Sequence, residues 1–178
     1  MFPFEHKYTV TVSDVRRASY FALVQRKRKS FIAMAAVIVF ALIYFGSSLA
    51  AGKPGLQIIY YIAGAYAVWG ILQFAGAEKL VRNNVKNPAS PIGKPTTAIF
   101  TKEDISIRIP ACSVDVTMTD KHLAVIFELQ ADYLVYTNAN QVYIVPKKGL
   151  SEERRQALRG LFRARLGDRF WTRFEKKK

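Results

Sequence analysis

The sequence predicts a membrane protein of the α+β class, with a two-helix transmembrane hairpin followed by a small β-rich domain and a C-terminal amphipathic helix. Residues 30–52 and 54–77 carry no charged side chain. Each stretch is long enough for a helix across a hydrocarbon core about 30 Å thick. Beyond residue 95 the chain changes to short apolar runs with the two-residue period of β-strands.

The predicted transmembrane hairpin covers residues 31–51 and 55–77. A short Gly/Pro turn joins the two helices, so the second must return antiparallel to the first. Two buried helices of a soluble core are the alternative, which the near absence of a polar stripe argues against. Ala63, Ala67 and Gly70 place small residues on one face of the second helix. We expect this face to pack closely on the first helix, with homodimerisation as the alternative.

Basic residues predict the orientation of the hairpin. Four consecutive cations precede the first helix: Arg26, Lys27, Arg28 and Lys29. The turn between the helices holds only Lys53. The positive-inside rule therefore predicts a protein of the bacterial inner membrane with both termini on the cytoplasmic side. The first helix is not expected to be a cleaved signal peptide, because a second apolar segment follows it at once.

The net charge of +14 on 178 residues raises the question of nucleic-acid binding. The chain has no zinc-finger spacing, basic leucine zipper or RNA-binding strand motif. Its cations gather where a membrane surface is expected, so we predict anionic lipid headgroups as their partners and no nucleic acid. The single cysteine, Cys112, cannot form an internal disulfide, which agrees with a reducing compartment.

Residues 1–30 are predicted to form a strand and then a basic helix. Alternation from Tyr8 to Val12 indicates the strand, and Ser13 or Asp14 is expected to cap the helix. We expect this strand to complete the sheet of the domain that follows the hairpin.

Residues 78–95, rich in Asn and Pro, are predicted to be a linker, and residues 96–178 to be the β-rich domain with its helix and basic tail. The expected strands cover residues 96–100, 105–109, 113–118, 123–129, 133–136 and 141–145. A capped amphipathic helix is expected to begin after Ser151.

Three stretches have a familiar organisation: FTKEDI at 100–105, DYLVY at 132–136 and YIVPKK at 143–148. With the basic helix, the two apolar segments and the final helix, they resemble the YcxB-like family of small bacterial membrane proteins over nearly the whole chain. The resemblance implies a cytoplasmic domain similar to pleckstrin-homology (PH) folds, a curved sheet closed by a C-terminal helix. It implies almost no chemistry.

We predict no catalytic, cofactor or metal site. Metalloprotease, nucleophile-elbow, phosphate-loop and dinucleotide motifs are absent from the sequence. The few polar residues of the apolar segments lie near their ends, which argues against a transport site. A membrane-bound enzyme is kept as an alternative that would depend on His122, Cys112 or Glu128.

Basic and aromatic residues are the candidates for contact with lipid or a protein partner. They are Arg26, Lys27, Arg28, Lys29, Lys147, Lys148, Arg169, Trp171 and Arg173. They favour a non-enzymatic binding or regulatory protein at the cytoplasmic surface of the membrane. Immunity against a toxin that attacks or enters through the inner membrane is the second hypothesis, and the sequence does not separate the two. The basic tail is either a membrane contact or a solvated segment.

Overall fold

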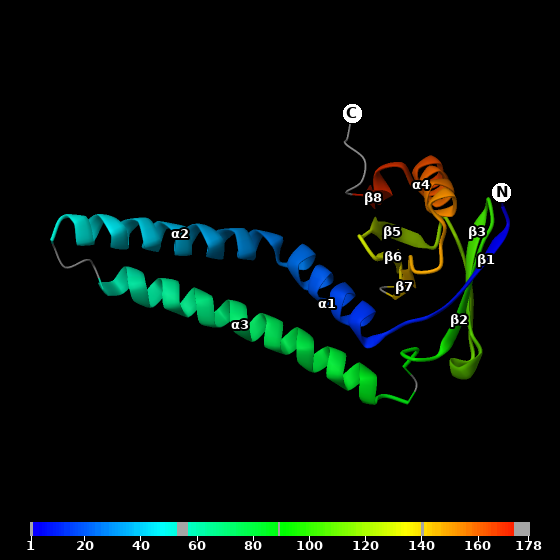
Figure 1. Ribbon diagram of the computed structural model, residues 1–178, viewed down its shortest axis with the longest axis horizontal. Helices are drawn as coiled ribbons and strands as arrows, with labels where there is room; N and C mark the ends of the chain where they lie inside the picture. The colour runs from blue at the N-terminus through cyan, green and yellow to red at the C-terminus, as the bar shows by residue number, and fades with distance from the viewer. Residues whose placement is uncertain (1, 53–56, 89, 140, 173–178) are drawn as a thin grey trace. The chain divides into compact units, whose positions relative to one another are not determined.

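A computed structural model of the chain describes residues 2–52, 57–88, 90–139 and 141–172 (Figure 1). The chain divides into two compact units. The first joins Met1–Ala18 to Asn84–Lys178, and the second is Ser19–Asn83. The N-terminal strand therefore belongs to the same unit as the C-terminal half of the chain, and the helical hairpin is an insertion within that unit.

Two four-stranded sheets form most of the first unit. The first sheet has the order β1 (Phe4–Thr9), β2 (Pro95–Phe100), β3 (Asp104–Ile109), β4 (Val114–Thr119). The second has the order β7 (Val142–Pro146), β6 (Asp132–Thr137), β5 (Leu123–Glu128), β8 (Phe170–Thr172). Neighbouring strands are antiparallel, except that β8 runs parallel to β5. The predicted small antiparallel-sheet domain is confirmed, with β2 to β7 within one residue of their expected ends.

Strand β1 completes the first sheet, as expected, by pairing along its whole length with β2 (Figure 1). Its position differs from the predicted one, because the chain enters helix α1 (Val12–Arg26) at Val12. Thr11 and Asp14 cause this early start. The Asp14 carboxylate accepts a hydrogen bond from Thr11 N at 2.8 Å, and Asp14 N donates to Thr11 Oγ1 at 3.3 Å. This reciprocal pair caps the helix. The cap residue is therefore Thr11, and not Ser13 or Asp14 as predicted.

The core of the first unit lies between the sheets and helix α4 (Glu152–Leu166). Phe162 of α4 is central, with its ring 6.2 Å from that of Phe100, 5.8 Å from Tyr133 and 5.6 Å from Phe170. The predicted helix start is confirmed, because the side chain of Ser151 accepts a hydrogen bond from the backbone of the third residue after it. Short 3-10 turns, η1 (Pro110–Cys112) and η2 (Gly167–Arg169), follow β3 and α4.

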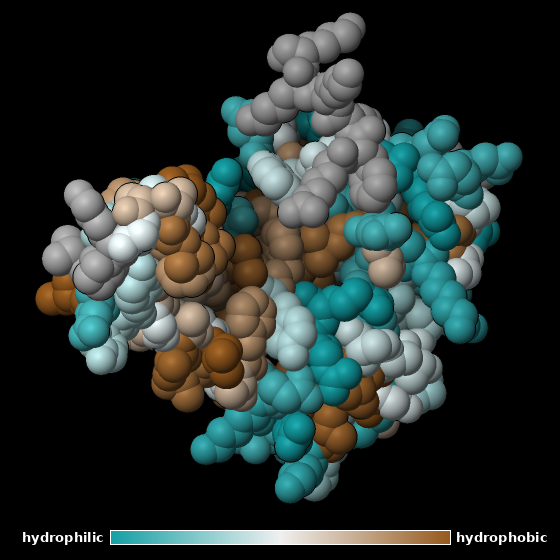
Figure 2. Space-filling model, turned by 60° about the vertical axis from the view of Figure 1, so that its left-hand side comes forward, coloured by the Kyte–Doolittle hydropathy of each residue, from teal (hydrophilic) through white to brown (hydrophobic). Residues whose placement is uncertain are grey.

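The second unit contains the end of α1 and the long helices α2 (Arg28–Ala50) and α3 (Gln57–Lys86). Both α2 and α3 are long and apolar enough to cross a membrane. Only 6% of the most apolar window of each helix is buried in the chain. Apolar side chains accordingly appear at the surface on the left of Figure 2, where these helices come forward.

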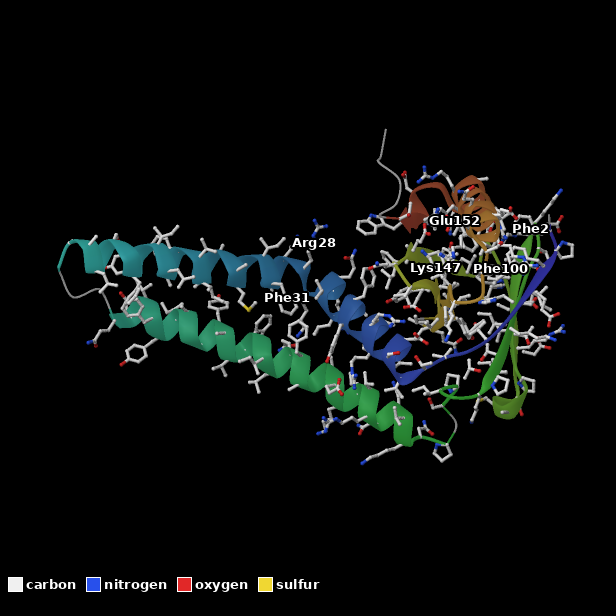
Figure 3. All side chains as sticks on the ribbon, in the orientation of Figure 1. Phe2, Arg28, Phe31, Phe100, Lys147 and Glu152 are labelled. Atoms are coloured by element: carbon white, nitrogen blue, oxygen red, sulfur yellow. The ribbon has the colours of Figure 1, made fainter. Side chains whose placement is uncertain are left out.

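Helices α2 and α3 approach each other through one glycine and several aromatic rings. A Cβ atom on Gly70 would lie only 2.8 Å from the Sδ atom of Met34. Of the other small residues expected on this face, Ala63 is half-buried and Ala67 is exposed. Phe31 points from α2 toward α3, where its ring lies 5.7 Å from that of Trp69 (Figure 3).

Helix α3 continues to Lys86, into the segment predicted to be a linker. Its C-terminal extension is held in place by Glu78, which accepts a hydrogen bond from the Tyr20 hydroxyl at 3.1 Å. Glu78 also pairs with Arg82 at 3.7 Å, one turn later on the same helix. The irregular connection to β2 is shortened accordingly.

Candidate binding sites

A groove of about 700 Å³ opens on the first unit where β1, the start of α1 and the loops flanking β6 and β7 come together. We call it the polar groove. Its cations are Lys7, Arg17, Lys147, Lys148 and Arg155, and its carboxylates are Asp14 and Asp132. These charges divide into pairs that hold the groove together and lysines that face solvent.

The ion pair of Arg17 with Asp132 joins the first turns of α1 to β6. Arg17 Nε lies 3.0 Å from Asp132 Oδ2, and the same guanidinium also pairs with Asp14. Burial raises the pKa of Asp132, and the hydrogen bonds from Arg17 only partly oppose this effect. The hydrogen bond with Asp132 in turn raises the pKa of Arg17. The pair therefore keeps a buried carboxylate next to a partner that stays charged.

Glu128, which is fully buried, is the centre of a second cluster. Its Oε1 atom accepts hydrogen bonds from Lys147 Nζ at 2.8 Å and Arg159 Nε at 2.7 Å, and its Oε2 atom accepts one from Thr172 Oγ1 at 2.6 Å. Burial by itself would raise the pKa of Glu128. The three donors outweigh burial, and the pKa is lowered.

Among the described residues, the ammonium group of Lys147 contacts groups inside the first unit. Besides Glu128, its ammonium group donates to the Leu129 carbonyl at 2.6 Å and lies 4.8 Å from the centre of the Tyr133 ring. Burial lowers the pKa of Lys147, and Glu128 opposes this shift. The side chain is almost fully buried, whereas the adjacent Lys148 is exposed at the rim of the groove. Of the two lysines expected to contact a ligand, the structure presents Lys148 to solvent.

The predicted tail residues lie in ordered structure as far as the described residues extend. Arg169 donates to the carbonyl of Leu123 at 2.8 Å, and so holds the turn before β5. Trp171 belongs to β8, and its ring meets Phe127 edge-on at 6.1 Å. Arg173 lies outside the described residues.

The three residues of the enzyme alternative lie on different elements and have different partners. His122 is exposed in a turn, where its Nδ1 atom accepts a hydrogen bond from Thr119 N at 3.2 Å. Cys112 follows β3 in η1, with Lys94 Nζ 3.3 Å from its sulfur. Glu128 belongs to the buried cluster. Within the described part of the chain, no group of three or more His, Cys, Asp or Glu side chains is placed to hold a metal ion.

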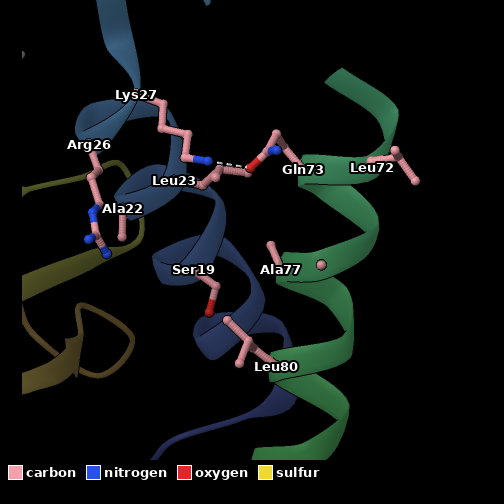
Figure 4. Close-up of a pocket in the computed structure, with 10 residues that line it drawn as sticks. Ser19, Ala22, Leu23, Arg26, Lys27, Leu72, Gln73, Ala77 and Leu80 are labelled. Carbon is pink, nitrogen blue, oxygen red and sulfur yellow. Dashed lines mark hydrogen bonds between the residues drawn. The ribbon is translucent and has the colours of Figure 1, made fainter. Parts of the chain in front are cut away.

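A second groove, of about 460 Å³, lies between the C-terminal half of α1 and α3 (Figure 4). We call it the helix groove. Ala22, Gly76 and Ala77 leave it open, and Leu23, Leu72 and Leu80 make it apolar. Polar atoms occur at both ends, with Ser19 at one end and the exposed Arg26 with Lys27 near the other.

Lys27 is fixed at the mouth of the helix groove by two residues that the sequence did not identify. Its ammonium group donates to Gln73 Oε1 at 2.5 Å and lies 5.6 Å from the centre of the Trp69 ring. Trp69 and Gln73 are four residues apart, so they share one face of α3. This four-residue spacing is the feature of the sequence that could have indicated that Trp69 and Gln73 act together. Arg28 and Lys29, the other cations of this run, are exposed at the start of α2.

Comparison of the chain with protein-family models, with curated proteins and with solved structures found no match.

Proposed function

We propose that this chain is a non-enzymatic binding protein anchored in the bacterial inner membrane. In this proposal α2 and α3 cross the bilayer, both termini are cytoplasmic, and the first unit is a PH-like domain presented at the inner membrane surface. A partner binds this domain in the polar groove. Anchoring confines the domain to a thin layer and so raises its effective concentration for partners at the same surface.

The exposed apolar surface of α2 and α3 is the observation that carries the proposal. Large side chains such as Ile43 and Ile71 are both 67% exposed. Each apolar side chain of this size costs roughly 1.5–3 kcal/mol when it is left in water instead of being buried. A core helix of a soluble protein would be mostly buried, whereas acyl chains would cover these helices along their length.

Charge supports the orientation. The exposed cations Arg28 and Lys29 begin α2, and Lys79, Arg82 and Lys86 lie near the end of α3. Both sets flank the same end of the antiparallel helix pair. This distribution favours a cytoplasmic position for that end, and with it for both termini.

The arrangement of the first unit supports a PH-like domain and a binding role. The likeness to the YcxB-like family implied one curved sheet, whereas the unit has two four-stranded sheets, and the C-terminal helix that packs on them is the feature that supports the proposal. An enzyme needs titratable groups directed at a substrate. Here Glu128 pairs with Lys147 inside the protein, and Asp132 pairs with Arg17. Lys7 and Lys148 remain exposed at the rim of the polar groove, which favours an acidic protein segment as the partner.

Co-purification of the full chain from mild detergent tests this proposal. The rim variant carries Lys7→Glu and Lys148→Glu, and the control carries Lys102→Glu and Lys121→Glu, two exposed lysines in turns of the same unit. We expect one protein to be recovered reproducibly with the native chain and the control, and to be lost with the rim variant. Equal recovery with all three chains would contradict the polar groove as the binding surface.

A further inference from the structure

We propose that the helix groove binds the headgroup of one anionic phospholipid of the inner leaflet. The phosphate lies between Arg26 and Lys27, the headgroup beyond it extends toward Ser19, and the acyl chains follow the exposed apolar side of α3. This inference rests on the proposed function, because the groove reaches lipid only if the hairpin spans the membrane.

The charge of the groove suits an anion. Its lining includes two cations and no carboxylate. Among the described residues neither Arg26 nor Lys27 pairs with an acidic side chain, and Lys27 is held in place by Gln73 and the Trp69 ring. Arg26 and Lys27 both line the groove. A positioned ammonium together with an Arg guanidinium, which bonds phosphate oxygens in pairs, is a suitable pair of donors for a phosphodiester.

The direction of the groove suits a lipid in a bilayer. Lys27 directly precedes α2, so its ammonium lies near the expected level of the phosphates. From there the groove runs between the helices toward Ser19 and Leu80, on the side away from the membrane core (Figure 4). In the opposite direction Leu72, which is 61% exposed, leads onto the apolar surface of α3. Headgroup and acyl chains thus have separate paths, and the path of the headgroup ends at the Ser19 hydroxyl.

The size of the groove depends on small residues, above all on Gly76. A Cβ atom added at Gly76 meets no atom within 4 Å, so a larger side chain there fills space instead of clashing with the helix. Gly64, on the same helix, has equally open surroundings but does not line the groove. The two glycines therefore make a matched pair, because Gly→Leu raises helix propensity equally at both positions.

The test measures binding of phosphatidylglycerol to the full chain purified in mild detergent, with phosphatidylcholine as the neutral probe. Retained lipid is counted by native mass spectrometry. We expect Gly76→Leu and Arg26→Gln each to reduce affinity for phosphatidylglycerol about tenfold, the usual effect of losing one charged hydrogen bond or an equivalent contact. Gly64→Leu and Lys121→Gln, the controls, should bind as the native chain does.

Phosphatidylglycerol binding that is equal in Gly76→Leu and Gly64→Leu would overturn the inference, and so would equal binding of the neutral lipid by the native chain. Alkaline carbonate washing of the same membranes separates this failure from failure of the proposed function. A native chain that stays in washed membranes but shows no groove-dependent binding contradicts only the lipid site. A native chain that is washed out contradicts the membrane anchor as well.

Discussion

The two units of this protein differ in which side chains they bury and which they expose. In the first unit Phe162 is 1% exposed and packed among other rings, whereas in the second Phe40 is 60% exposed. Charges show the reverse pattern, because the first unit buries Glu128 and Asp132 with cations, whereas the apolar stretches of the long helices, residues 30–50 and 57–77, contain no charged side chain. This contrast is expected of a protein that has one unit surrounded by water and the other surrounded by lipid acyl chains.

Polar contacts sharpen the contrast within the second unit. Two side-chain hydrogen bonds between its helices, Lys27 with Gln73 and Tyr20 with Glu78, lie in the C-terminal half of α3. Farther along the hairpin the helices meet through Gly70 and Met34 or through rings such as Phe45 and Tyr60. Close packing without polar groups is the mode of association that a bilayer favours.

The largest predicted effect on stability comes from replacing one phenylalanine by alanine in each unit and comparing the two variants. Phe162→Ala leaves a cavity among three rings and should destabilise the first unit by about 3–5 kcal/mol. Phe40→Ala removes a ring that contacts the surroundings instead of a core, so the first unit should keep its native stability. Amide hydrogen exchange of the strands, measured on the full chain, reads the two effects separately. Similar loss of protection in both variants would break the comparison.

Two adjacent lysines give the next largest effect. Lys147→Met removes the buried ammonium from Glu128 and should cost about 3 kcal/mol, the lower end of what breaking a buried pair costs. Lys148→Met, at the exposed neighbouring position, should change stability by less than about 0.5 kcal/mol. Chemical denaturation of the first unit within the full chain measures both values. Equal midpoints would mean that Lys147 is not part of a buried pair.

Acidification should act on the two buried carboxylates with opposite sign. The lowered pKa of Glu128 means that its stabilising contribution is complete above its unfolded value of 4.5 and is lost as the pH falls through the lower folded value. The raised pKa of Asp132 gives a contribution that is present below 3.8 and is lost as the pH rises through the folded value. Glu128→Gln should therefore flatten the loss of stability in acid, whereas Asp132→Asn should steepen it. Unfolding free energies of the three chains on either side of pH 4.5 give the sign directly.

The smallest predicted effect concerns the contact between the long helices. Gly70→Ala places a Cβ atom against the flexible end of Met34, so the hairpin should lose about 1 kcal/mol. Gly64→Ala, where the space is open, is the control, and Met34→Ala should restore the pairing in the Gly70→Ala chain. Thermal unfolding in detergent ranks the four chains. No difference between Gly70→Ala and Gly64→Ala would show that the helices do not approach closely at Gly70.

Local patterns predicted much of this fold because the signals lie within single elements. The alternation of Ile105, Ile107 and Ile109 determines which face of β3 is buried, and Ser151 caps its helix as expected. The uncharged stretches likewise predicted two long apolar helices, which the structure contains.

Long-range pairing is what the sequence did not reveal. Strand β8 has only three residues and sits among cations, so it was interpreted as tail, and its order comes from pairing with β5 more than 40 residues earlier. Lys147 stands beside Lys148 and looks equally solvent-exposed in the sequence, but its carboxylate partner lies 19 residues away. At Val12 a local cap prevailed over the alternating pattern that predicted a longer strand.

Cysteine accessibility tests the membrane arrangement most directly. In a Cys112→Ala chain, which lacks the single native cysteine, Ala51→Cys marks the end of α2 and Lys121→Cys marks a turn of the first unit. We expect a membrane-impermeant maleimide added to intact spheroplasts to label the cysteine at 51 and to reach the one at 121 only after the membrane is permeabilised. Labelling at 121 in intact spheroplasts, or protection at 51, would contradict a hairpin that crosses the membrane with both termini inside.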